Sequence, residues 1–102
     1  MSDSVYKIMP AADWAAAKAT GAYTGSVDDV RDGFIHFSTR EQVAGTLAKH
    51  FAGQQDLVIV IVDPTQLGAT LVWEPSRGGA LFPHLYGVLP VSAAVGVERV
   101  GV

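Results

Sequence analysis

Apolar residues recur at every second position in some segments of the chain, which predicts strands, and at every third or fourth position in others, which predicts helices. Two alternating faces over Val5–Met9 predict a first strand. Alanine, the strongest helix former, dominates Ala11–Ala19, with Pro10 suited to the first turn of this helix and Gly21 to its end. Residues 23 to 32 contain glycine, serine and an acidic pair, so we predict a loop there.

The next predicted strand carries the first residues of chemical interest. Gly33–Thr39 alternates, so that Ile35 and Phe37 point to one face while His36 and Ser38 point to the other. If the first pair enters the core, the second pair faces another layer or a cleft.

A strongly marked amphipathic helix follows this strand. Its apolar face recurs every four residues, at Val43, Leu47 and Phe51. Two overlapping capping boxes precede it, Ser38 with Glu41 and Thr39 with Gln42. We therefore expect a helix to about residue 51, closed by Gly53, with its apolar face buried against a sheet.

The second half of the chain predicts mainly strands. Leu57–Val62 is continuously apolar, as in a central strand covered on both faces, whereas Ala69–Glu74 alternates, and Val95–Val100 is predicted to be the last strand. Phe82–Gly87 has no clean period and is predicted to be an irregular segment that covers the sheet edge or walls a cleft. The predicted helices lie early in the chain and most of the predicted strands lie late. This order favours an α+β fold with a mixed or antiparallel sheet and two main helices.

Composition narrows the class of protein. The 102 residues suit a single domain over positions 1–102, and 49% apolar residues supply a core. The net charge of −3 and the scattered basic residues argue against a nucleic-acid partner. The absence of cysteine excludes disulfide and thiolate chemistry. With no signal peptide and no apolar run long enough to span a bilayer, we expect a cytoplasmic monomer without a membrane partner.

Two of the three histidines are candidates for chemistry. His50 lies near the end of a helix, where the dipole favours a cation, and is predicted to be a surface residue. His36 and His84 are embedded in apolar segments, where a buried polar group needs a partner. They are either hydrogen-bonded structural residues or two groups that share one cleft.

The spacing of potential ligands does not predict a metal site, because the histidines are far apart in sequence and cysteine is absent. Arg77 precedes a pair of glycines, which indicates weakly a site for an anion. Glu74 lies three residues before it, and the two form either an ordinary surface ion pair or part of a site.

Two segments, Gly33–Thr39 (GFIHFST) and Phe82–Gly87 (FPHLYG), resemble the signature segments of a bacterial and plant family known as domain-of-unknown-function family 952. Further matching positions are Trp14, Tyr23, Gln42, Asp56, Leu57, Trp73 and Glu74, so that the resemblance covers nearly the whole chain. It implies the ADP-ribosyltransferase-like fold, which is a split β-sheet with a nicotinamide-nucleotide cleft, and NAD as a cofactor.

The resemblance also implies roles for individual residues. In the transferases a strand histidine holds the ribose and is followed by a small residue and then by serine or threonine. His36 and Ser38 match this pattern, whereas Phe37 replaces the small residue. A transferase further needs a carboxylate to stabilise the oxocarbenium-like centre, for which Glu98 and Glu74 are the candidates.

We therefore expect a small-molecule site for a nucleotide or ADP-ribose-type ligand, with transferase or hydrolase activity as an open question. The candidate catalytic residues are His36, His84 and Glu98. The candidate ligand-binding residues are Ser38, Tyr23, Trp73, Glu74, Arg77 and Tyr86, with the aromatic rings as walls of the cleft. The alternatives are a two-histidine phosphoesterase, for which Tyr86 departs from the second half-motif, and a non-catalytic binding module with structural histidines.

Overall fold

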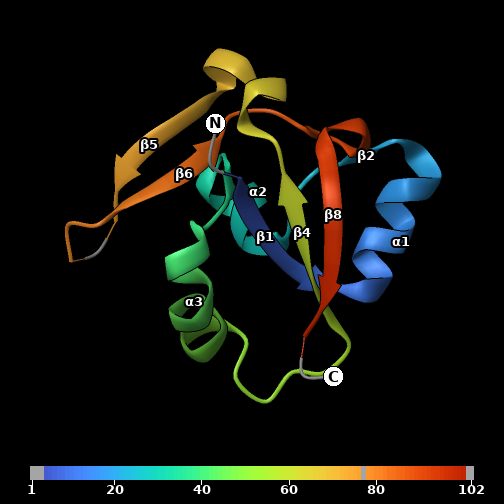
Figure 1. The fold of residues 1–102 in the computed structure, drawn as a ribbon, viewed down its shortest axis with the longest axis horizontal. Coiled ribbons are helices and arrows are strands. Elements are labelled where there is room, and N and C mark those ends of the chain that lie inside the picture. Colours follow the sequence, from blue (N-terminus) through green and yellow to red (C-terminus); the bar gives the residue numbers. More distant parts are fainter. Residues whose placement is uncertain (1–3, 77, 101–102) are drawn as a thin grey trace.

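A computed structural model describes residues 4–76 and 78–100, and in it the apolar strand β4 (Leu57–Val62) is the centre of the first sheet (Figure 1). This strand lies between β1 (Val5–Pro10) and β8 (Ala94–Arg99), and both pairings are antiparallel. Most of β4 is buried, which confirms the prediction of a central strand covered on both faces. The fold is α+β, and all strand pairs among the described residues are antiparallel.

Helix α1 (Ala11–Thr20) follows β1 directly and ends as the sequence predicts. Gly21 takes a positive φ of 93°, a conformation that glycine adopts without steric cost, and its N–H donates to the carbonyl of Ala17. Trp14 and Ala17 are the buried residues of this helix and join the main core.

The predicted loop over residues 23 to 32 is wrong in two respects. Strand β2 (Ala22–Tyr23) pairs with β7 (Leu89–Pro90), and helix α2 (Val27–Asp32) follows it. The helix is six residues long and has no apolar stripe, so periodicity does not reveal it. Its start is nevertheless fixed by a capping box between Ser26 and Asp29.

A second three-stranded sheet contains both candidate histidines. Its order is β3 (Ile35–His36), β6 (Leu81–Leu85) and β5 (Leu71–Pro75), so β6 is the middle strand and the prediction of an irregular segment there is wrong. The sequence argued against a middle strand here because Pro83 has no backbone N–H to donate to a neighbouring strand. Here its carbonyl still accepts from the N–H of Phe37, at 2.9 Å.

The two three-stranded sheets meet and separate at Ser38. Its backbone exchanges two hydrogen bonds of 2.8 Å with Tyr6 of β1, whereas Phe37, one residue earlier, still pairs with β6. The segment from Ile35 to Ser38 therefore crosses from one sheet to the other, and its side chains lie where the sheets diverge. Ile35 and Phe37 are buried in the main core, as their alternation predicts.

Helix α3 (Val43–His50) covers the other face of the first sheet, after a 3₁₀ turn at Arg40–Gln42. The predicted capping box of Thr39 and Gln42 is present, whereas the hydroxyl of Ser38 pairs with Thr46 instead. The apolar side chains of the helix pack on this face as expected. Leu47 is only partly buried, so it is not the fully buried residue that the pattern predicts.

The helices of the described residues are short. None of those within residues 4–76 and 78–100 has the length and apolarity needed to cross a membrane.

Candidate functional site

His36 and His84 lie directly opposite each other on the neighbouring strands β3 and β6. Their ring centroids are 5.5 Å apart, with the ring planes at 69°. Phe34 stacks on His84 at 4.0 Å and contacts His36 at 4.6 Å, so that it fixes one side of both rings. The pairing of the two strands thus brings together two imidazoles that are 48 residues apart in the chain, from 36 to 84.

His36 is held by two carboxylates of helix α2. Its Nδ1 lies 2.6 Å from Asp29 and its Nε2 lies 3.0 Å from Asp32, one turn further along the helix. A neutral imidazole has a single N–H and can donate to only one of them, whereas the doubly protonated ring donates to both. Each nitrogen of His36 therefore faces a carboxylate acceptor.

Asp29 is the buried anchor of this group. Its carboxylate is 2% exposed and lies 2.9 Å from Nζ of Lys7, which is itself buried on β1. It also accepts from the backbone N–H groups of Ser26 and His36. Burial alone raises the pKa of Asp29, but the hydrogen bond from His36 and the charge of Lys7 outweigh burial and hold that pKa well below its usual range.

Burial shifts the pKa of Lys7, the ion-pair partner of Asp29, in the opposite direction. Loss of solvation lowers the pKa of Lys7, and the attraction of Asp29 offsets part of that shift. Each of these two buried side chains therefore stabilises the charged form of the other, and Asp29 links the pair to His36.

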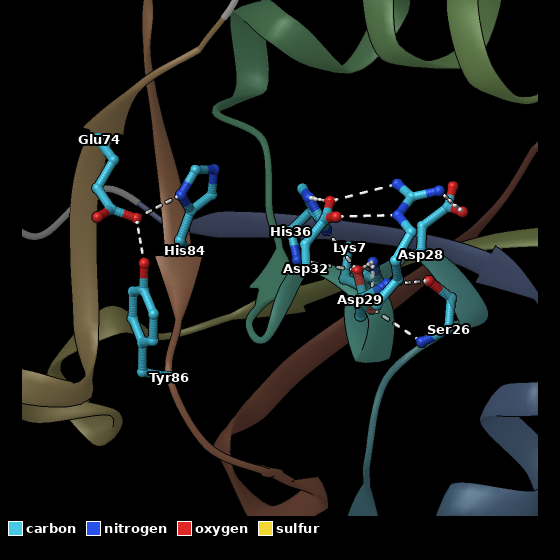
Figure 2. Close-up of polar contacts among 10 residues, drawn as sticks. Lys7, Ser26, Asp28, Asp29, Asp32, His36, Glu74, His84 and Tyr86 are labelled. Atoms are coloured by element: carbon cyan, nitrogen blue, oxygen red, sulfur yellow. Dashed lines mark hydrogen bonds and ion pairs between the residues drawn. The ribbon is translucent and has the colours of Figure 1, made fainter.

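His84 has a simpler environment, with Glu74 of β5 as its partner (Figure 2). Its Nδ1 lies 2.7 Å from Glu74 of β5, and the same carboxylate oxygen accepts from the hydroxyl of Tyr86 at 2.8 Å. The hydrogen bond with His84 and that from Tyr86 lower the pKa of Glu74, while the bond to Glu74 raises the pKa of Tyr86. Figure 2 shows the two histidines between this pair and the carboxylates of α2.

Both imidazoles line a cleft of about 790 Å³ at the point where the two sheets diverge. Its walls come from α2, α3, the edge strand β1 and the start of β6. Its charged lining residues are Lys7, Arg31, Lys49, Asp28, Asp29, Asp32 and Glu41.

Besides the histidines, four of the predicted site residues can be placed relative to His84 and the cleft. Glu74 contacts His84 directly, and Tyr86 donates to the same carboxylate oxygen of Glu74. Ser38 lines the cleft but is 4% exposed, and its hydroxyl is taken up by Thr46 at 3.0 Å. Trp73 lies opposite Pro83, one residue out of phase with His84, so alternation places it on the other face of the sheet.

Two further predictions are corrected, and one falls outside the described part of the chain. Glu98 lies on β8 and pairs with Arg40 at 3.6 Å, in a separate groove. Tyr23 is buried in the main core, where burial raises the pKa of its phenol, so it cannot form a wall. Arg77 lies outside the described residues.

Three residues around His36 were not predicted: Asp29 and Asp32, which hold its ring, and Lys7, which pairs with Asp29. One signal was present: Ser26 and Asp29 have the spacing of a capping box, which predicts the start of a helix. A helix there places Asp29 and Asp32 on one face, because residues three apart are neighbours. Among the described residues, no group of three or more histidine, aspartate or glutamate side chains is arranged to hold a metal ion.

The state of Asp29 predicts how stability depends on pH. Because its pKa is lowered in the folded protein, its contribution is complete above about pH 4, the pKa of an unfolded aspartate. It is lost as the pH falls further toward the folded value. We expect the urea midpoint to drop steeply below about pH 4, measured as a series of urea titrations. A carboxyl carbon signal of Asp29 that titrates at the ordinary value in NMR spectra would contradict this.

Comparisons with known proteins place the chain among relatives. A family model described as "Protein of unknown function (DUF952)" matches residues 8–97. The crystal structure of protein CC0527 from Caulobacter crescentus is similar at 50% identity and a TM-score of 0.90, over 93% of this chain and 83% of that one. The solution NMR structure of CC0527 matches at 50% identity and a TM-score of 0.84, over 94% and 83% of the two chains. No curated protein matches the chain.

Proposed function

The chain belongs to the DUF952 family of proteins of unknown function, and from the geometry of its histidine cleft we propose that it binds a small nucleotide of the ADP-ribose type. One observation carries this proposal. His36 and His84 face each other across two paired strands, 5.5 Å apart, and each ring is oriented by a carboxylate. Fixed in this way, His84 presents its Nε2 to a small ligand, and the Nε2 of His36 can donate to the same ligand where a ligand oxygen replaces Asp32.

The other groups of the cleft suit ribose and phosphate. Lys49 supplies positive charge on the α3 wall, whereas Arg31 on the α2 wall is ion-paired with Asp28 and Asp32 and would have to exchange these contacts for a phosphate. The cleft volume of about 790 Å³ falls within the range of small-molecule sites, roughly 300–1,000 Å³. A nucleotide therefore matches the cleft both in size and in chemistry.

The charge balance favours a small nucleotide over a polynucleotide. The lining has three permanently basic side chains and four acidic ones, so it offers no continuous positive surface for a phosphate backbone. A ligand with one or two phosphates can be met locally by Lys49, and by Arg31 in exchange for its contacts with Asp28 and Asp32.

The split antiparallel sheet supports an ADP-ribosyltransferase-like fold, but the residues present fit only part of the chemistry of an NAD-dependent transferase. His36 can bind ribose by exchanging Asp32 at its Nε2, whereas Ser38 is bonded to Thr46 and Phe37 is buried in the core. The carboxylate expected at Glu98 lies in another groove. We therefore propose nucleotide binding and no glycosyl transfer from NAD.

The proposal is tested by calorimetric titration with AMP, ADP-ribose, NAD and a nucleoside 2′,3′-cyclic phosphate. For a nucleotide that binds, His36→Ala should weaken binding by about 1–3 kcal/mol, the cost of leaving a hydrogen-bonded partner unpaired. Glu98→Gln is the matched control and should leave the affinity unchanged, because Glu98 lies outside the cleft. Failure of all four compounds to bind the wild-type protein, or equal affinities of wild type and His36→Ala, would exclude the proposed site.

A further inference from the structure

The two histidines have different partners, and this difference assigns them different roles. His84 engages Glu74 through Nδ1 alone, and its Nε2 has no hydrogen bond or ion pair to any described residue. His36 engages Asp29 and Asp32 through both nitrogens. One ring therefore has a free nitrogen, and the other has both nitrogens on carboxylates.

The partners set the proton positions. An Nδ1–H that donates to Glu74 fixes the tautomer of His84 in which Nε2 carries a lone pair, as required of a base. His36 has a carboxylate acceptor at each nitrogen, so the doubly protonated ring donates to both and is the form that acts as an acid. The charged or titratable groups around the pair are Glu74 of β5, Tyr86 after β6, Lys7 of β1 behind Asp29, and four residues of α2: Asp29, Asp32, and Arg31 between Asp32 and Asp28.

We propose that His84 and His36 act as general base and general acid in the hydrolysis of a ribose cyclic phosphodiester, a function that rests on the nucleotide site proposed above. Cleavage of a phosphodiester by water needs a base for the nucleophile and an acid for the leaving alkoxide. Rings 5.5 Å apart both reach oxygens of one phosphate group, since each requires only a hydrogen bond of about 2.6–3.2 Å.

The step is balanced in atoms and protons. The water oxygen forms a bond to phosphorus while its proton passes to Nε2 of His84. The bond between phosphorus and one ribose oxygen breaks, and its electron pair stays on that oxygen. The oxygen takes a proton from Nε2 of His36, where it replaces the Asp32 carboxylate as the acceptor. The product is a ribose phosphomonoester, and exchange with solvent restores the two protonation states.

Asp29 and Glu74 are committed to the two histidines. Asp29 is buried on Lys7 and His36, and Glu74 is shared by His84 and Tyr86. Both carboxylates therefore act by positioning the imidazoles.

The experiment follows a nucleoside 2′,3′-cyclic phosphate by phosphorus NMR with the full chain. Wild type should convert the cyclic phosphate to the monoester. His84→Gln and His36→Gln should each lower the rate by about 10²–10⁴-fold, the usual contribution of an acid or base. Glu98→Gln should retain the wild-type rate. No turnover by a wild-type protein that binds AMP would overturn the acid–base assignment and leave the nucleotide site standing, whereas absence of nucleotide binding would overturn both.

A second variant separates positioning from general stability. Glu74→Gln should lower the rate about 10–100-fold while leaving AMP affinity within twofold, because Glu74 orients His84 without contacting ligand. The loss should fall on kcat, with KM for the cyclic phosphate within twofold of wild type, because Glu74 acts on the ring of His84 and not on the ligand. A KM that rises in step with the fall in rate would show that Glu74 has only a structural role, and would contradict the assignment of His84 as base.

Discussion

Asp29→Asn should lower the free energy of unfolding by about 3–5 kcal/mol, the cost of leaving one member of a buried ion pair without its partner. Asp29 is 2% exposed and lies 2.9 Å from the buried ammonium of Lys7. The same carboxylate accepts from the ring of His36 and completes the capping box of α2. The substitution removes the negative charge on which all these contacts depend, and urea denaturation measures the loss.

Two further variants isolate the cause. Asp28→Asn changes the adjacent residue, whose carboxylate is 65% exposed, and should alter stability by no more than about 0.5 kcal/mol. Lys7→Met removes the stranded charge, so the double variant Lys7→Met/Asp29→Asn should be more stable than Asp29→Asn alone. Equal losses from Asp28→Asn and Asp29→Asn, or additive losses in the double variant, would refute the buried pair as the anchor of the site.

Phe37→Ala should cost about 3–5 kcal/mol, as is usual for a fully buried phenylalanine. Phe37 is among the largest fully buried side chains and lies on the segment that crosses from β6 to β1. Loss of its ring leaves a cavity beneath the junction of the two sheets, so the cleft should also lose its geometry. Stability is measured by denaturant titration.

Phe82→Ala is the matched control, because Phe82 is a partly exposed phenylalanine of the neighbouring strand β6. It should cost clearly less than Phe37→Ala, since less apolar area returns to water. A loss below about 1 kcal/mol for Phe37→Ala would mean that its site collapses around the missing ring or is not tightly packed.

Periodicity predicted the elements that have a strong apolar pattern or a strong stop signal. Leu57–Val62 could be predicted as a central strand because six consecutive apolar residues need cover on both faces. The end of α1 at Gly21 and the capping box at Thr39 depend on local chemistry that is visible in the sequence. Helix α2 and strand β6 were missed because the first is too short for a period and the second contains a proline.

The site could be predicted only in part, because its geometry depends on strand register and on helix α2. Alternation indicated that His36 points away from Ile35 and Phe37, and the structure agrees. That His84 lies opposite His36 depends on strand register, which is a tertiary property that no local pattern encodes. The partners of His36 come from a helix that was predicted as a loop, and Trp73 was misplaced because register determines its face.

Amide chemical shifts in a titration with AMP test most directly the claim that a nucleotide occupies the histidine cleft. We expect the largest changes, by ¹H–¹⁵N correlation spectra, at His36 and His84 and at residues of α2, with β8 unaffected. In the His36→Ala variant the same changes should require a higher AMP concentration, by about 5–150-fold. Changes confined to the groove of Arg40 and Glu98, or no changes at millimolar AMP, would contradict the claim.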